Sequence, residues 1–176
     1  MSFETRFTEE EQLLLASTPT LIGSAMAFAE SSGLATVKEL MESAKSYMAG
    51  LQAYPDNDII QGILPNLEDR NAAMAQAKDF RDKTLARLKD KGIDAPEKIR
   101  SLLIEDAQHI NELLKEKANP KEAAEYKQWA MSVAANVAKA AKEGGFLGFG
   151  GERVSEGEKT LFAELGRVLE TDTRLA

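Results

Sequence analysis

Apolar residues recur every three or four positions over long stretches of this chain, which is the spacing that places them on one face of an α-helix. Two such stripes are clearest: one consists of Ile99, Leu102, Leu103, Ile110, Leu113 and Leu114, and the other of Tyr126, Trp129, Ala130, Val133, Val137 and Ala141. No segment alternates apolar and polar residues as a half-buried strand does. The pattern therefore predicts an all-α protein.

Capping boxes mark the expected helix starts. In this motif a Ser, Thr, Asp or Asn residue stands three positions before a Glu, and each side chain accepts a hydrogen bond from the other residue's backbone N–H. The pairs are Thr8 with Glu11, Thr36 with Glu39, Asp94 with Glu97, Asn119 with Glu122, and Ser155 with Glu158. Five helices are expected to begin at these positions.

Proline residues mark the remaining helix boundaries. Pro19 is expected to begin a further helix, because proline is tolerated in the first turn and breaks a helix interior. Pro55 and Pro65 are expected to bracket a short helical turn, and a long helix follows from about Asn66 to Lys91. The whole chain, residues 1–176, is thus expected to form one domain of about seven helices packed as a bundle.

Composition narrows the class of protein. The chain has no cysteine, which excludes thiol catalysis, disulfides and zinc–thiolate sites and favours the cytoplasm. Its net charge of −7 disfavours a nucleic-acid partner. No apolar stretch approaches the roughly 18 residues of a membrane span, and the acidic N-terminus is unlike a signal peptide. We therefore expect a soluble cytoplasmic protein.

A small group of charged residues is the candidate ligand site. Asp106 falls by helical phase inside the first apolar stripe, where a carboxylate needs a partner. Arg70 and Arg81 fall among apolar residues of the long helix, so we expect one of them to form a buried ion pair with Asp106. His109, the only histidine, stands one turn beyond Asp106 and cannot alone complete a di-iron site. The alternative to a structural ion pair is a small-ligand or metal site built from Asp106, His109, Arg70 and Arg81.

Residues 144–151 are rich in glycine and phenylalanine and precede the last predicted helix. The first glycines are suited to ending a helix in the left-handed conformation. The apolar side chains of Phe146, Leu147 and Phe149 either cover the open end of the bundle or stay exposed as a contact for a partner or a second subunit. Phosphate binding is less favoured, because no strand precedes the loop and no lysine follows at P-loop spacing.

Two segments of the chain share one plan, in which an alanine-rich helix, a glycine turn and a cap with a following glutamate lead into a second helix. Gly33 and Glu39 carry it in the first segment, and Val154, Ser155 and Glu158 carry it in the second. Either duplication of a hairpin or independent occurrence of the same capping motif would account for the repeat. The pattern resembles the hairpins of TerB-like tellurite-resistance proteins, which are small all-helical bacterial proteins linked to stress. The family's aspartate is missing from both segments, so the acidic metal site that the resemblance implies is not expected here.

These observations lead to two hypotheses of different classes. Without cysteine or a second histidine there is no conventional nucleophile and base pair, so we assign no catalytic residue, no metal and no cofactor. The leading hypothesis is a non-enzymatic bacterial protein that acts through contacts with another protein or with itself, as in a homodimer. The alternative is a bundle that binds a small ligand or a metal through Asp106, His109 and the arginines.

Overall fold

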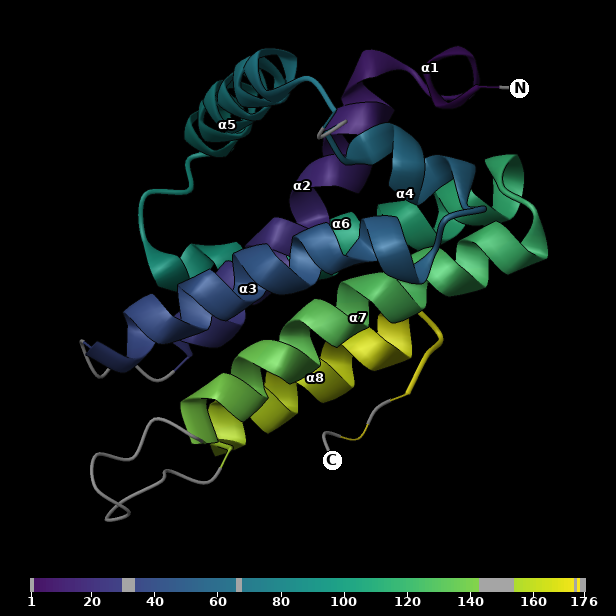
Figure 1. Ribbon diagram of the computed structural model, residues 1–176. Helices are drawn as coiled ribbons and strands as arrows, with labels where there is room; N and C mark the ends of the chain where they lie inside the picture. The colour runs from purple at the N-terminus through teal and green to yellow at the C-terminus, as the bar shows by residue number, and fades with distance from the viewer. Residues whose placement is uncertain (1, 30–33, 66–67, 143–153, 173, 175–176) are drawn as a thin grey trace.

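The computed structural model describes residues 2–29, 34–65, 68–142, 154–172 and 174, and the regular structure in these residues is entirely helical (Figure 1). Six long helices and two short ones form one bundle in this part of the chain. They are α1 (Phe3–Arg6), α2 (Glu9–Phe28), α3 (Leu34–Ala53), α4 (Asp58–Ile63), α5 (Arg70–Asp90), α6 (Pro96–Lys117), α7 (Pro120–Lys142) and α8 (Glu156–Val168). The predicted all-α fold is confirmed.

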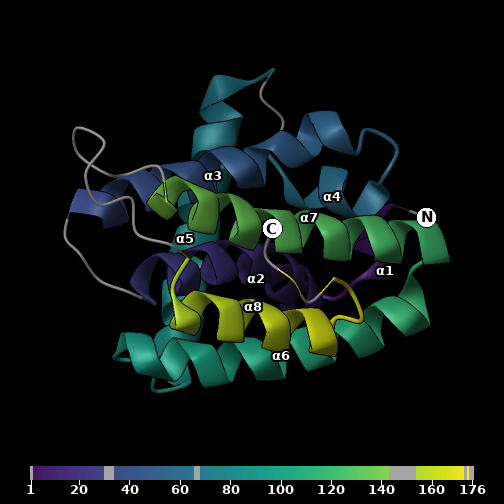
Figure 2. The ribbon, with the colours of Figure 1, turned by 90° about the horizontal axis from the view of Figure 1, so that it is seen from below.

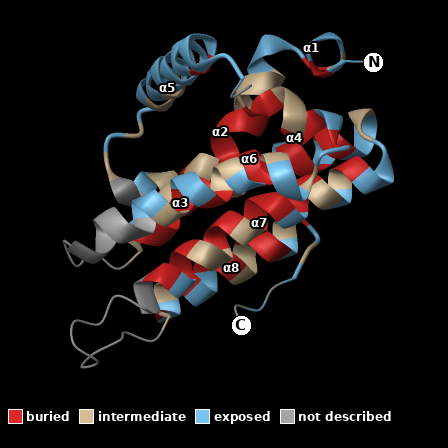
Figure 3. Ribbon diagram, in the orientation of Figure 1, coloured by how far each residue is buried: buried red, intermediate tan, exposed pale blue. Residues whose placement is uncertain are grey.

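Helix α7 lies at the centre of the bundle. It packs against α2 and α3 on one side and against α8 on the other, while α6 packs against α2 and α8 (Figure 2). Helix α5 stands apart on the outside and rests on α2 (Figure 1). The burial of the side chains agrees with this arrangement. The residues of α7 are mostly buried or half-buried, whereas those of α5 are mostly exposed (Figure 3).

Both predicted apolar stripes face the core. Of the first stripe, all members are buried except Ile99, which is half-buried and packs against the core. Of the second, the residues from Tyr126 to Val137 are buried, and the side chain of Ala141 lies outside the described part. The helical periodicity alone was therefore enough to identify the core faces of α6 and α7.

Three of the capping boxes form as predicted. In each, the glutamate N–H donates to the capping side chain and the cap's own N–H donates to the glutamate carboxylate. The pairs are Thr8 with Glu11, Asn119 with Glu122, and Ser155 with Glu158. These three sequence signals locate the starts of α2, α7 and α8.

The other two boxes were wrong. Helix α6 has Ala95 at its N-cap, without a side-chain hydrogen bond, and the Asp94 carboxylate instead lies 2.8 Å from the Lys98 ammonium. An ion pair between two residues one helical turn apart thus replaces the predicted cap. Helix α3 begins at Leu34, so Thr36 lies inside the helix and cannot be its N-cap.

Pro19 also differs from the prediction, because it lies in the middle of α2 and does not begin a helix. Proline has no N–H, so the Leu15 carbonyl loses its usual helical donor. The Tyr126 hydroxyl of α7 donates to that carbonyl oxygen at 2.7 Å. The Tyr47 hydroxyl of α3 donates to the neighbouring Ala16 carbonyl at 3.2 Å. Two neighbouring helices therefore supply hydrogen bonds to the interrupted turn, and α2 continues through it.

An aromatic cluster joins α3 to α7 at the same level. The Trp129 ring centroid lies 5.1 Å from that of Tyr47 and 5.7 Å from that of Tyr126, and the indole N–H donates to the Tyr47 carbonyl at 3.1 Å. Gly50 makes room for the indole, since a Cβ at this position would lie 2.6 Å from Trp129 Nε1. The close approach of α3 to α7 therefore requires a glycine here.

Candidate functional site

Asp106 is buried on α6 and forms an ion pair with Arg87 of α5. The two guanidinium nitrogens Nη1 and Nη2 donate to the two carboxylate oxygens at 2.9 and 2.5 Å. The side chain of Asp106 is 1% exposed and that of Arg87 is 19% exposed. The geometry is bidentate, which is the stronger form of such a pair. The prediction that Asp106 needs a cationic partner is confirmed, but the partner is Arg87.

Arg70 and Arg81 lie away from Asp106, so the predicted ion pair to either of them was wrong. Arg70 is the exposed first residue of α5, and Arg81 is exposed and donates to the carboxylate of Asp82 beside it. The physical reason is the rotation of α5. Its inward side carries Ala73, Phe80, Arg87 and Leu88, while Met74 and Leu85, which appeared to mark the core face, are exposed.

His109 lies on the exposed side of α6 and lines a groove of ≈ 780 Å³ between α2, α5 and α6. Arg87, which the sequence did not single out, lines the same groove, but His109 is the only member of the predicted charged group that lines it. His109 forms no hydrogen bond with another described residue. Among the described residues, no three His, Asp or Glu side chains are arranged to hold a metal ion. The groove therefore offers charged side chains but no metal-ligand set.

The predicted contact loop falls within residues 143–153. Phe146, Leu147 and Phe149 lie outside the described residues, as do the turns of both predicted hairpins. The helices on either side of those turns, α2 with α3 and α7 with α8, do pack against each other.

A second groove, which the sequence did not reveal, lies between α2 and α5 with α3 and α4 at its floor and end. Its volume is ≈ 540 Å³, and its apolar wall includes Leu13, Met48, Ile63 and Phe80. Three small side chains on facing helices leave the space open, namely Ala16 on α2, Ala44 on α3 and Ala77 on α5. Volumes of this size, with mostly apolar walls, are typical of small-molecule sites. The arrangement depends on four separate helices, so no local sequence signal indicates it.

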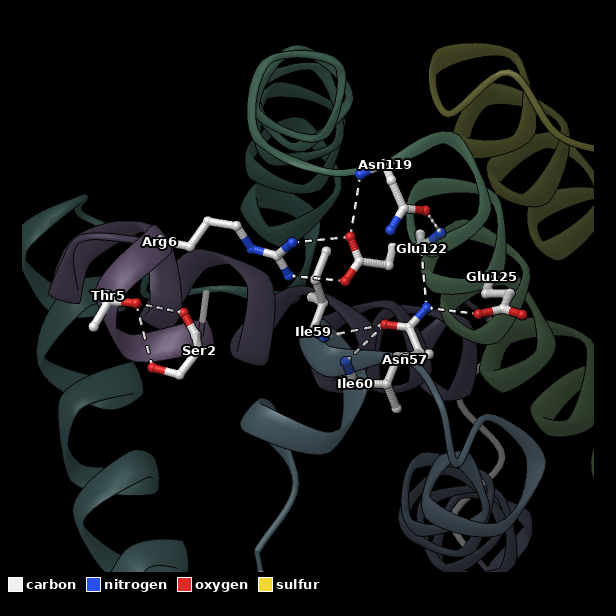
Figure 4. Close-up of polar contacts among 9 residues, drawn as sticks. All are labelled: Ser2, Thr5, Arg6, Asn57, Ile59, Ile60, Asn119, Glu122 and Glu125. Carbon is white, nitrogen blue, oxygen red and sulfur yellow. Dashed lines mark hydrogen bonds and ion pairs between the residues drawn. The ribbon is translucent and has the colours of Figure 1, made fainter.

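Sequence reasoning also missed a polar network that fastens the N-terminal segment to α7 (Figure 4). The Arg6 guanidinium donates to both oxygens of the buried Glu122 carboxylate, at 2.9 and 3.1 Å. Buried Asn57 caps α4 and donates to the Glu122 carbonyl and to the Glu125 carboxylate (Figure 4). Although burial raises the pKa of Glu122, the hydrogen bonds from Arg6 and from the Asn119 backbone leave it below its ordinary value. Apart from the buried Nε of Arg6, which has no hydrogen-bond partner among the described residues, these groups pair with one another, which indicates a structural role.

A buried lysine forms another such cluster. The Lys127 ammonium on α7 donates to the Asn111 side-chain oxygen at 2.5 Å, and the Asn111 amide donates to Glu170 at 3.1 Å. Lys115 donates to the same Glu170 oxygen at 2.6 Å. Burial lowers the pKa of Lys127. The cluster ties α6 and α7 to the segment that follows α8.

The fold and these sites define an all-α helical bundle with two surface grooves on either side of α5. Within the part of the chain that the structure describes, no helix has the length and apolar character needed to cross a bilayer. No family model, curated protein or solved structure matches the chain. The resemblance of its two hairpins to TerB-like proteins therefore has no support from a family match.

Proposed function

We propose that this protein acts by binding another protein or a second copy of itself, without catalysis, and that the outward face of α5 makes the contact. The observation that carries the proposal is the exposure of two large apolar side chains on this face. Met74 is 63% exposed and Leu85 is 57% exposed. They stand eleven positions apart, which is close to three helical turns, so both project from the same side of α5.

The weak attachment of α5 supports this role. Ala73 is the only buried residue of the helix, and most of its other side chains are in solvent. Lys78 and Arg81 lie between Met74 and Leu85 at helical spacing, giving an outward face with apolar ends and a charged centre. Amphipathic helices often bind partners through side chains at such intervals.

The absence of an assigned catalytic group is consistent with a binding role. His109 is exposed and has no hydrogen-bonded partner among the described residues, so nothing there orients it as a general base. We further propose a cytoplasmic setting, because the chain has no cysteine. A stress-associated role rests on the TerB-like hairpin pattern alone.

The test compares M74D/L85D with the matched control M41D, since Met41 of α3 is also strongly exposed, at 70%. Static light scattering over a concentration series would measure self-association, and a photo-crosslinking residue at position 74, 85 or 41 would report a foreign partner. We expect M74D/L85D, but not M41D, to lose the oligomer if the protein self-associates. If the partner is a foreign protein, we expect one discrete crosslinked product from positions 74 and 85 but none from position 41. A monomeric wild type without a product specific to these positions would contradict the proposal.

A second candidate function is binding of a small ligand by the charged cluster, which is favoured by the groove that His109 and Arg87 line. It has less support, because both oxygens of Asp106 are already occupied by Arg87 and the other two arginines lie elsewhere. If anionic metabolites or divalent ions raised the melting temperature of the wild type but not of H109A, this candidate would be favoured.

A further inference from the structure

The apolar groove between α2 and α5 is separate from the outward face of α5. Helix α5 forms one wall with Ala77 and Phe80, α2 forms the other with Leu13 and Ala16, and Met48 of α3 lies at the floor. Its volume of ≈ 540 Å³ lies within the range of sites that bury most of a drug-sized ligand. The shape thus suits one small molecule.

Two of the four hydroxyl groups that line the groove already have partners within the helices, whereas the hydroxyls of Thr20 and Ser43 form no hydrogen bond with a described residue. The Tyr47 hydroxyl donates to the Ala16 carbonyl, and the Ser24 hydroxyl donates to the Thr20 carbonyl at 3.0 Å. Burial also raises the pKa of Tyr47, so this hydroxyl stays uncharged. A ligand gains little by presenting polar groups to these positions. Because the lining of the groove is mostly apolar, the part of the ligand inside it should be apolar, apart from any group that pairs with Thr20 or Ser43.

Three exposed charged residues line the groove where it opens to solvent, namely Glu9, Asp79 and Lys83. The Lys83 ammonium lies 2.8 Å from the Asp79 carboxylate, so these two charges neutralise each other. Glu9 forms no ion pair with any described residue. Asp79 is the main cause of the raised pKa of Lys83, and the charge of Glu9 adds to it, so the three groups at the opening carry a net charge of −1, which attracts a cation and repels an anion.

We infer that this groove binds an apolar molecule that carries a single positive charge, with its apolar body between α2 and α5 and its cationic group beside Glu9. A carboxylate-bearing ligand would meet Glu9 directly and would have to displace Asp79 from Lys83. The inference does not depend on the proposed protein contact, because Met74 and Leu85 do not line the groove.

The test titrates the protein with decylammonium, decanoate and decanol, which share a chain and differ in charge, each below its micelle concentration. Trp129, the only tryptophan, contacts Tyr47 in the groove wall, so its fluorescence should report binding, with calorimetry as an independent measurement. We expect decylammonium to bind most tightly and decanoate most weakly.

Two pairs of variants locate the binding. Glu9→Gln should weaken decylammonium binding about two- to fivefold, as expected for loss of an exposed ion pair, and should leave decanol binding unchanged. Glu10→Gln is the matched control, since Glu10 does not line this groove. Ala44→Phe fills the groove from an exposed position and should weaken all binding about tenfold, whereas Ala49→Phe, on the same helix but outside the groove, should not.

Ala77→Phe on α5 provides a second filling variant in case Ala44→Phe unfolds the protein. Decanoate binding as tightly as decylammonium, or equal effects of Glu9→Gln and Glu10→Gln, would overturn the cationic assignment. No binding of any of the three probes, or unchanged binding in a folded filling variant, would overturn the small-molecule site itself. Neither result bears on the contact made by α5.

Discussion

Helices α5 and α7 have similar lengths, 21 and 23 residues, yet α7 is the centre of the core and α5 lies almost entirely in solvent. In α7 the large apolar residues are buried, and α2, α3 and α8 are its main neighbours. In α5 they divide between two faces, with Phe80 turned inward and Met74 and Leu85 turned outward. A helix can therefore be long and regular without contributing much to the core, and its free face is then available for binding.

The two helices are also held by different means. Hydrogen bonds and aromatic contacts fix α7 along its length, whereas the most buried polar contact of α5 is the ion pair between Arg87 and Asp106. Breaking each attachment in turn tests this contrast.

The largest effect is expected for Arg87→Ala. This change leaves the carboxylate of Asp106 buried without a partner and should lower the free energy of unfolding by about 3–5 kcal/mol. Chemical denaturation measures the loss, and hydrogen exchange should show that the amides of α5 lose more protection than those of α7.

Two control variants distinguish the loss of the ion pair from a non-specific loss of stability. Arg81→Ala, on the exposed side of α5, should change stability by less than about 0.5 kcal/mol. The double variant R87M/D106L removes both charges and should recover most of the loss. Equal losses in Arg81→Ala and Arg87→Ala would contradict the assignment of Arg87 as the partner.

A smaller effect is expected for Tyr126→Phe on α7. It removes the donor to the Leu15 carbonyl, which Pro19 deprives of its helical partner, and should cost about 1–3 kcal/mol. Pro19→Ala restores a backbone N–H at that position, so it should stabilise the Tyr126→Phe protein more than it stabilises the wild type. A double-mutant cycle by thermal unfolding measures this difference, and strict additivity of the two changes would rule the explanation out.

The smallest effect is the pH dependence contributed by Glu122 near the start of α7. Because its folded pKa is lowered from the ordinary value of 4.5, its contribution is complete above that value and is lost as the pH falls through the folded pKa. The wild type should therefore lose stability on acidification more steeply than Glu122→Gln does. Denaturation curves from about pH 6 to about pH 3 compare the two, and parallel curves would contradict a lowered pKa.

The fold was largely predictable from local signals. The stripes of α6 and α7 and three capping boxes were correct because each depends on residues within a few turns of one another. Asp94 was misread because a nearby lysine competes for its carboxylate, and Pro19 because its compensation comes from Tyr126, more than a hundred positions along the chain.

The sites were less predictable, because they depend on contacts between segments that are far apart in the sequence. The need of Asp106 for a cation followed from helical phase, but the choice between Arg70, Arg81 and Arg87 depends on how α5 rotates against α2. The groove arises where four helices meet, and its three alanines are far apart in sequence. Such features follow from the packed structure and not from any one segment.

The hydrogen bond from Tyr126 to Leu15 also bears on the order of folding. A helix with an interior proline has a weak point where its two halves are not joined by the usual bond, so α2 in isolation should form as two fluctuating pieces. Joining them requires α7 to arrive from a distant part of the chain, which carries the entropic cost of closing a long loop. Completion of α2 and docking of α7 should therefore be a single cooperative step, which makes this contact a natural place for the folding nucleus.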